Sequence, residues 1–135
     1  MVIHTHKITI INIRRPKQSN LNENLQYFGN ALGLFNLRDK DKSCFRIFIE
    51  LLKAARFNIG FTSDELAYKL NLTRGTVVHH LNKLIESGIV ISERNRYFLR
   101  VANLQELVEE LMRDAQRTGE QLKAMAEEID RSMGL

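Results

Sequence analysis

Two threonines and a glycine divide residues 62–88 into two short helices, and these helix start and stop signals constrain the fold more than any other feature of the sequence. Thr62 and Glu65 have the spacing of a capping box, in which each side chain satisfies a free backbone N–H group of the other residue. Thr73 follows a short break and is placed to cap a second helix. Gly88 ends that helix in the left-handed conformation that glycine adopts at low cost. The pattern predicts two consecutive helices with a short turn between them.

Two amphipathic helices are predicted before this pair. Apolar residues that step by three and four indicate one helix over residues 21–34 and another over residues 43–56. Ser43 is the expected N-cap of the second helix. The inward face of that helix is expected to hold Phe45, Phe48, Ile49, Leu52 and Ala55.

A hairpin and a long helix are predicted after the pair. The runs IVIS and RYFLR are rich in β-branched or aromatic residues, and the polar residues 93–96 between them predict a hairpin turn. Asn103 is the expected cap of a helix that runs to about Met133. At the other end of the chain, residues 1–14 are rich in isoleucine and threonine and predict a strand. The polar segment around Pro16 then predicts a linker.

Length and composition limit the class of protein. The chain has 135 residues, of which 44% are hydrophobic and 27% charged, and this suits one globular domain with additions. We expect a strand or arm with a linker over residues 1–20, a domain over residues 21–102 and a terminal helix over residues 103–135. The sequence contains neither an apolar run of transmembrane length nor the apolar block of a signal peptide, so we expect a cytoplasmic protein.

Charge is unevenly distributed along the chain. Lys and Arg exceed Asp and Glu by four in residues 1–42 and again by four in residues 43–102, whereas acidic residues exceed basic ones by four in residues 103–135. This distribution indicates a domain that meets a polyanion and a terminal segment that stays away from it. Net charge alone is weak evidence, because many basic proteins bind no nucleic acid.

The predicted order of helix, helix, short turn, helix, hairpin and helix is that of a winged helix-turn-helix. The run FTSDELAYKLNLTRGTVVHHLNKLIESGIV, residues 61–90, resembles the winged-helix transcription regulators of the ArsR-like group, especially its archaeal members. The resemblance implies a mainly α fold with a small β-hairpin wing and a DNA-binding function. It also implies that the long terminal helix is a dimerisation helix.

The helix of residues 73–87 is the candidate recognition helix. Val77, Leu81 and Leu84 lie within about a quarter turn of one another and would anchor it to the core. The opposite face is small and polar, which suits insertion into the major groove. Taken alone, this face is equally consistent with an ordinary solvated helix surface. The predicted DNA-contacting residues of this helix are Thr73, Arg74, Thr76, His79, Asn82 and Lys83.

The hairpin favours the DNA-binding interpretation. Arg94 and Arg96 bracket Asn95 at the expected tip, where two cations have no apolar surroundings to explain them. A wing beside a recognition helix would direct both arginines at phosphates or at a minor groove. We therefore add Arg94 and Arg96 to the predicted DNA-contacting residues.

No metal or cofactor site is predicted. Cys44 is the only cysteine and begins an apolar run, which indicates a buried thiol. His79 and His80 point about 100° apart on a helix and do not readily chelate one ion, so His80 is expected to pack against the domain. His4 and His6 would share a strand face, but two ligands are too few. Metal-sensing members of the resembled family carry a cysteine pair in the recognition helix or Asp and His ligands in the terminal helix. This chain lacks both, and the resemblance therefore implies a regulator without a metal effector.

The terminal helix carries an apolar seam of the coiled-coil type. Its apolar residues alternate steps of four and three over a helix about 45 Å long, more than one small domain can cover. A second copy of the chain is the simplest partner. The acidic residues, including Glu110 and Asp114, are expected to face solvent. The predicted dimerisation residues are Leu104, Val108, Leu111, Leu122, Met125 and Ile129.

The sequence thus predicts a sequence-specific regulator, a repressor, that binds double-stranded DNA as a homodimer. The alternative is a winged-helix module that holds other proteins of the transcription machinery. An enzyme is not expected, because the chain shows no phosphate-binding glycine loop, no nucleophile elbow and no carboxylate pair with a supporting histidine.

Overall fold

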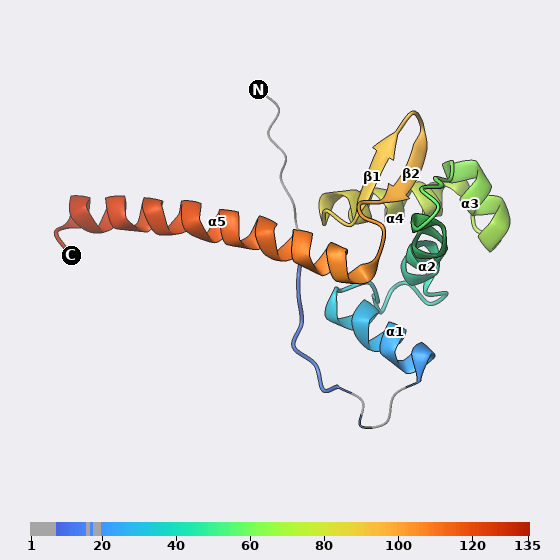
Figure 1. Ribbon diagram of the computed structural model, residues 1–135, viewed down its shortest axis with the longest axis horizontal. Helices are drawn as coiled ribbons and strands as arrows, with labels where there is room; N and C mark the ends of the chain where they lie inside the picture. Colours follow the sequence, from blue (N-terminus) through green and yellow to red (C-terminus); the bar gives the residue numbers. More distant parts are fainter. Residues whose placement is uncertain (1–7, 16, 18–19) are drawn as a thin grey trace.

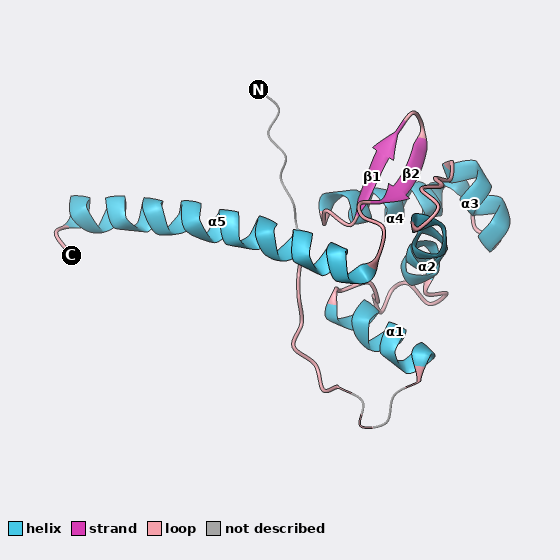
Figure 2. Ribbon diagram, viewed as in Figure 1, coloured by secondary structure: helices cyan, strands magenta, loops and turns pink. Residues whose placement is uncertain are grey.

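The computed structural model describes residues 8–15, 17 and 20–135. A helical unit is followed by a two-stranded antiparallel hairpin and by a long helix that projects from the rest of the molecule (Figures 1 and 2). This arrangement confirms the predicted fold class, a winged helix-turn-helix with a long C-terminal helix. The elements in chain order are α1 (Leu21–Ala31), α2 (Ser43–Ala55), α3 (Ser63–Leu70), α4 (Arg74–Glu86), β1 (Val90–Glu93), β2 (Arg96–Leu99) and α5 (Leu104–Met133).

Side chains cap four of the helices, and the caps at Thr62, Thr73 and Asn103 were predicted, whereas the cap at Asn20 was not. Of the capping box expected at Thr62 and Glu65, the Thr62 hydroxyl makes its bond, while the Glu65 carboxylate pairs with Arg96. Helices α1, α3, α4 and α5 each follow a residue whose side chain accepts a hydrogen bond from a backbone N–H three positions on, namely Asn20, Thr62, Thr73 and Asn103. The prediction for α2 is wrong, because Ser43 is the first helical residue and not the cap. The Asp39 carboxylate instead accepts hydrogen bonds from the N–H groups of Ser43 (2.9 Å) and Cys44 (3.0 Å). A side chain from the preceding loop thus satisfies the start of α2.

Helix α2 lies at the centre of the core. Ile47, Phe48 and Leu51 are at most 1% exposed, and α3, α4 and β2 all contact this helix. The buried face is rotated from the predicted one, because only Phe48 of the five predicted inward residues is fully buried and the other four are half-buried. The elements that pack on α2 decide which face is buried: α3, α4 and β2 contact this helix, and Phe28 of α1 stacks on Phe48 with ring centroids 6.4 Å apart.

The hairpin is shorter at its tip than predicted. β1 and β2 pair in antiparallel register over four residues each. Arg94 and Asn95 alone make the turn, and both have positive φ (52° and 64°), as a two-residue type I′ turn requires. Phe61, just before α3, exchanges backbone hydrogen bonds of 3.1 and 2.8 Å with Tyr97 of β2. This bridge attaches the wing to the start of the helix-turn-helix.

The N-terminal prediction is wrong where it can be compared. Residues 8–15 form no strand, while residues 1–7, with His4 and His6, lie outside the described residues, as does Pro16. A strand needs a neighbour with free backbone groups, and side-chain preference alone does not provide one. The segment instead contacts the end of α1, where the Ile11 N–H donates to the Ala31 carbonyl at 2.8 Å.

Only the start of α5 belongs to the core. Leu107 and Leu111 are 0% and 3% exposed, and Leu104 and Val108 are half-buried. From residue 115 onward every side chain is exposed, and Figure 1 shows this part of the helix extending away from the domain. None of the helices in the described ranges is long and apolar enough to cross a membrane.

Candidate nucleic-acid interface

Helix α4 is held in the domain by a narrow apolar face. Val77 and Leu81 are 0% exposed and Leu84 is 1% exposed, as the sequence predicts. Thr73 begins the helix, and its hydroxyl oxygen accepts a hydrogen bond from the Thr76 N–H at 3.2 Å. Because three large side chains are fully buried along one face, α4 is fixed in rotation about its own axis. The opposite face is therefore presented in one defined orientation.

The outer face of α4 is open. Gly75, His79, Asn82 and Lys83 are all exposed, and a Cβ atom at Gly75 would meet nothing within 4 Å. A small residue at this point lets the helix backbone come close to a partner. The four residues lie on one side of the helix, so the structure brings three of the six predicted contact residues of α4 together, namely His79, Asn82 and Lys83.

The other predicted residues of α4 lie at its N-terminus and make contacts within the protein. The Thr73 hydroxyl donates to the Thr76 hydroxyl oxygen at 2.8 Å, and Thr76 is half-buried. Arg74 forms an ion pair of 3.5 Å with Asp64 of α3, and both side chains are more than 70% exposed. Such an exposed pair contributes little to stability, so the Arg74 guanidinium can exchange its carboxylate for another anion at low cost.

The two arginines of the wing lie in different environments. Arg94 is exposed at the hairpin tip. Arg96 is the first residue of β2, where its guanidinium donates to the Gly60 carbonyl at 3.0 Å and pairs with Glu65 at 3.2 Å. Glu65 therefore faces the wing. The ring of Phe98 also approaches Gly60 so closely that a Cβ there would lie 2.5 Å from it. Arg96 holds the wing against the start of α3, and Arg94 is the cation at the tip.

His80 lies on the inner flank of α4, as expected for a residue that packs against the domain. It is 6% exposed, its Nε2 lies 3.8 Å from an Asp39 oxygen, and its Nδ1 has no hydrogen-bond partner within the described structure. Burial lowers the pKa of His80, and the nearby Asp39 charge only partly opposes this effect. Burial raises the pKa of Asp39, but the N–H groups of Cys44 and Ser43 and the charge of His80 outweigh it, so that pKa is lowered. Neutral His80 is therefore the form that the fold favours.

Stability should consequently fall in mild acid. Because the folded protein lowers the pKa of His80 below its ordinary 6.5, the unfolded chain binds this proton more readily. The favourable contribution is present above that ordinary pKa and is lost as the pH falls through the folded value. We expect the free energy of unfolding, measured in urea, to decrease from about pH 7 to about pH 5. His80→Gln should flatten this dependence, and Asn82→Gln at an exposed position of the same helix should leave it unchanged. An equal slope in all three proteins would contradict the assignment.

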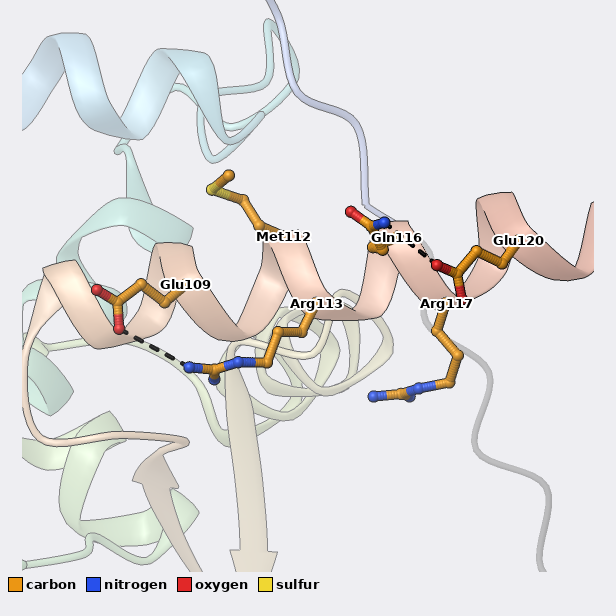
Figure 3. Close-up of a pocket in the computed structure, with 6 residues that line it drawn as sticks. All are labelled: Glu109, Met112, Arg113, Gln116, Arg117 and Glu120. Carbon is orange, nitrogen blue, oxygen red and sulfur yellow. Dashed lines mark hydrogen bonds and ion pairs between the residues drawn. The ribbon is translucent and has the colours of Figure 1, made fainter.

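A surface hollow beside the domain offers no enclosed binding site. It lies along α5 and is lined by Glu109, Met112, Arg113, Gln116, Arg117 and Glu120 (Figure 3). One helix supplies all of these side chains, so the hollow is open on its other sides. Among the described residues, no group of three or more His, Cys, Asp or Glu side chains is placed to hold a metal ion. Cys44 is buried, and burial raises the pKa of its thiol to about 11.

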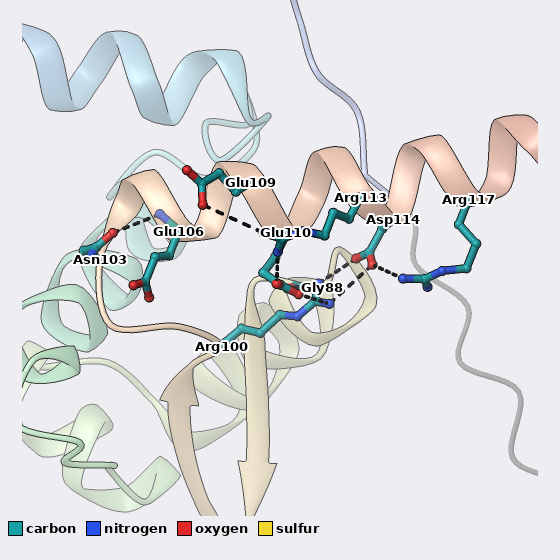
Figure 4. Close-up of polar contacts among 9 residues, drawn as sticks. All are labelled: Gly88, Arg100, Asn103, Glu106, Glu109, Glu110, Arg113, Asp114 and Arg117. Atoms are coloured by element: carbon teal, nitrogen blue, oxygen red, sulfur yellow. Dashed lines mark hydrogen bonds and ion pairs between the residues drawn. The ribbon is translucent and has the colours of Figure 1, made fainter.

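One cluster beside the interface was not foreseen. Glu110 and Asp114 were expected to face solvent, but both are half-buried, and both bind the guanidinium of Arg100 just after β2 (Figure 4). The signal was present in the sequence, because two acidic residues four positions apart share one face of a helix and a basic residue precedes them. The identity of the cation could not be chosen from the sequence.

The comparison with known families identifies the central motif. Residues 62–92 match the family model described as "Bacterial regulatory protein, arsR family", a region that spans α3, the turn, α4 and the start of β1. No curated protein matches the chain, and no solved structure matches it either.

The match indicates the functional class of protein to which this interface belongs. Residues 62–92 are similar to an ArsR-type helix-turn-helix, which indicates a DNA-binding regulator of transcription. The particular likeness to archaeal members of the group stays a prediction.

Proposed function

We propose that this protein is a sequence-specific repressor that binds double-stranded DNA as a homodimer and blocks access to a promoter. The observation that carries the proposal is the outer face of α4. It is exposed and polar, its orientation is fixed by three buried anchors, and it lies within the ArsR-type match. A rigid polar helix face beside a basic hairpin tip is the arrangement that reads a major groove.

The exposed side chains in the middle of α4 are assigned to the bases. Asn82 has the paired donor and acceptor that recognise the N6 and N7 edge of adenine. Lys83 and His79 can donate to guanine or to phosphate from the same exposed face. Together with Gly75, which allows close approach, these residues form the proposed reading surface.

The ends of the interface are assigned to the DNA backbone. Thr73, Arg74 and Thr76 lie at the N-terminus of α4, where backbone N–H groups and the helix dipole favour phosphate. Arg94 provides a cation at the wing tip. Arg96 contributes mainly by holding the wing in place through Gly60 and Glu65.

The second half of α5 is assigned to dimerisation. Leu122, Met125 and Ile129 are 66%, 54% and 48% exposed at coiled-coil spacing. Monomeric proteins rarely expose a continuous apolar stripe, and a second copy of this helix has the matching stripe. Of the other predicted seam residues, Leu111 belongs to the core of its own domain and Leu104 packs against that core, while Val108 is half-buried.

We therefore propose an organisation in three parts. Residues 1–20 form an arm and linker, residues 21–102 form the DNA-binding domain, and residues 103–135 form the dimerisation helix. The first turns of that helix also complete the core of the domain, because Leu107 and Leu111 are buried there. A fragment that ends at residue 102 should for this reason be less stable than the full chain.

Selection of bound fragments from genomic DNA tests the proposal. The expected result is enrichment of a short two-fold symmetric sequence, with half-sites about one helical turn (~34 Å) apart. Affinity for the selected site should fall by orders of magnitude between about 50 and 200 mM salt, because phosphate contacts release counterions. If no sequence is enriched and the protein stays off random duplex at low salt, the proposal fails, and the alternative of a protein-interaction module is favoured.

Arg94→Ala should weaken binding without regard to sequence. If Arg94 contacts a phosphate, its loss reduces affinity by a similar factor on the selected site and on a random duplex. The slope of log affinity against log salt should decrease in magnitude by about one. Fluorescence anisotropy titrations at four salt concentrations measure both quantities. Lys123→Ala on the distant part of α5 is the matched control, and an unchanged slope for Arg94→Ala would place this residue away from the backbone.

A further inference from the structure

Arg100 joins three parts of the molecule that the proposed function needs to hold together. Its Nη1 donates to Asp114 Oδ2 at 2.6 Å and to the carbonyl of Gly88 at 3.4 Å, and its Nη2 donates to Glu110 Oε2 at 3.1 Å and to Asp114 Oδ1 at 3.3 Å. Gly88 follows the end of α4, Arg100 itself follows β2, and the two carboxylates belong to α5. Figure 4 shows the guanidinium lying between the wing and α5.

The geometry of this junction makes it stiff. Two parallel N–H···O bonds join the planar guanidinium to the Asp114 carboxylate, and such a bidentate pair fixes direction as well as distance. The side chains of Arg100 and Asp114 are only 21% and 12% exposed, so solvent screens the pair less than a surface ion pair. The hydrogen bond to Asp114 also raises the pKa of Arg100, and an arginine side chain is charged at any working pH.

The position of the junction means that a small change there alters the direction of the rest of α5. Asp114 lies where the core contacts of α5 end and its fully exposed part begins. The helix continues for about 28 Å from Asp114 to Met133, and a tilt of about 10° at Asp114 would move its far end by about 5 Å. In a dimer held by the exposed part of α5, the same tilt changes the separation of the two recognition helices.

We propose that Arg100 is a positioning residue that fixes the angle between α5 and α4, and thereby selects the half-site spacing that the dimer accepts. This inference rests on the proposed function. It predicts that loss of the Arg100 fork leaves each reading surface intact but relaxes the choice of spacing. A purely structural role would instead weaken binding to a single half-site and to a full site alike.

The first experiment measures geometry without DNA. Cys44 is buried, so a Glu86→Cys variant, changed at the exposed last residue of α4, takes up one spin label per chain. Double electron–electron resonance should give one narrow distribution of distances between the two labels of the dimer when Arg100 is retained. Arg100→Gln should broaden or shift that distribution. Arg117→Gln is the matched control, because Arg117 also pairs with Asp114, at 3.6 Å, but within α5; its distribution should stay narrow.

The second experiment measures spacing selectivity on DNA. Duplexes with two half-sites at increasing separations are titrated alongside a single half-site. The wild type and Arg117→Gln should prefer one separation. Arg100→Gln should bind the single half-site within about twofold of the wild type but lose at least tenfold of the preference between separations. Arg100→Lys keeps the charge without the fork and should lose part of it.

Each outcome decides the matter. A wild type that binds no duplex or gives no interspin distance overturns the proposed function and this inference with it. A functional wild type whose Arg100→Gln variant keeps both the narrow distance and the spacing preference overturns the inference alone, as does a parallel loss of half-site binding. If Arg100→Gln does not fold, Asp114→Asn removes the charge of the fork in a side chain of the same size, and the same two readouts apply.

Discussion

Leu122→Glu is expected to dissociate the dimer while each domain stays folded. Leu122 is 66% exposed in the single chain, so glutamate there costs the monomer little. In the proposed seam the same side chain would be desolvated without a cation, and the dissociation constant should rise by at least about 100-fold, or about 2.8 kcal/mol. Sedimentation equilibrium measures this change, and circular dichroism verifies that the helical content of the domain remains.

Ala124→Glu is the matched control for this prediction. It adds the same charge two residues further along α5, and that position lies about 200° around the helix from Leu122. The control variant should remain dimeric, and only Leu122→Glu should bind a symmetric site with little more than half-site affinity. If the wild type is monomeric at tens of micromolar, or if both variants associate equally, the seam does not pair two copies.

Joint replacement of His79, Asn82 and Lys83 by alanine is expected to abolish sequence preference. These side chains are exposed, and exposed positions shift stability by less than about 0.5 kcal/mol each. Each well-placed contact to a base contributes about 1–3 kcal/mol of discrimination, so the loss of the set should reduce affinity for the selected site by at least about 100-fold. Binding to random duplex should weaken much less, because Arg74 and Arg94 remain.

The control for this variant is an equal change elsewhere on the surface. Replacement of Gln105, Gln116 and Lys123 on α5 by alanine removes side chains of similar polarity from exposed positions and should leave affinity unchanged. Thermal denaturation should show that both triple variants melt close to the wild type. A folded reading-surface variant with undiminished affinity would show that DNA is contacted elsewhere.

The proposed contacts and the proposed dimer make different demands on the fold. The reading surface depends on the rotation of α4, which Val77, Leu81 and Leu84 fix from inside the domain. The half-site spacing depends on the direction of α5, which the Arg100 junction connects to the end of α4 through Gly88. A variant that alters one property and not the other is therefore obtainable, and it would separate affinity for a half-site from selection of the full site.

What the sequence alone determined is the order of elements and the anchoring of the recognition helix. Thr62, Thr73, Asn103 and Gly88 end or begin helices through bonds within a few residues, so local chemistry decides them. The inward face of α4 followed from helical periodicity for the same reason. The hairpin was equally local, although its tip proved to be only two residues long.

Tertiary structure decided the features that depend on neighbours distant in sequence. Residues 8–15 had the composition of a strand but form none, and the buried face of α2 was decided by α3, α4 and β2, which pack against this helix. Asp39 replaced Ser43 as the cap because a loop brought its carboxylate to the start of α2. Glu110 and Asp114 do not face solvent as expected, because both carboxylates pair with the partly buried guanidinium of Arg100. Periodicity shows which residues share a face of a helix, but only the packed chain shows what that face meets.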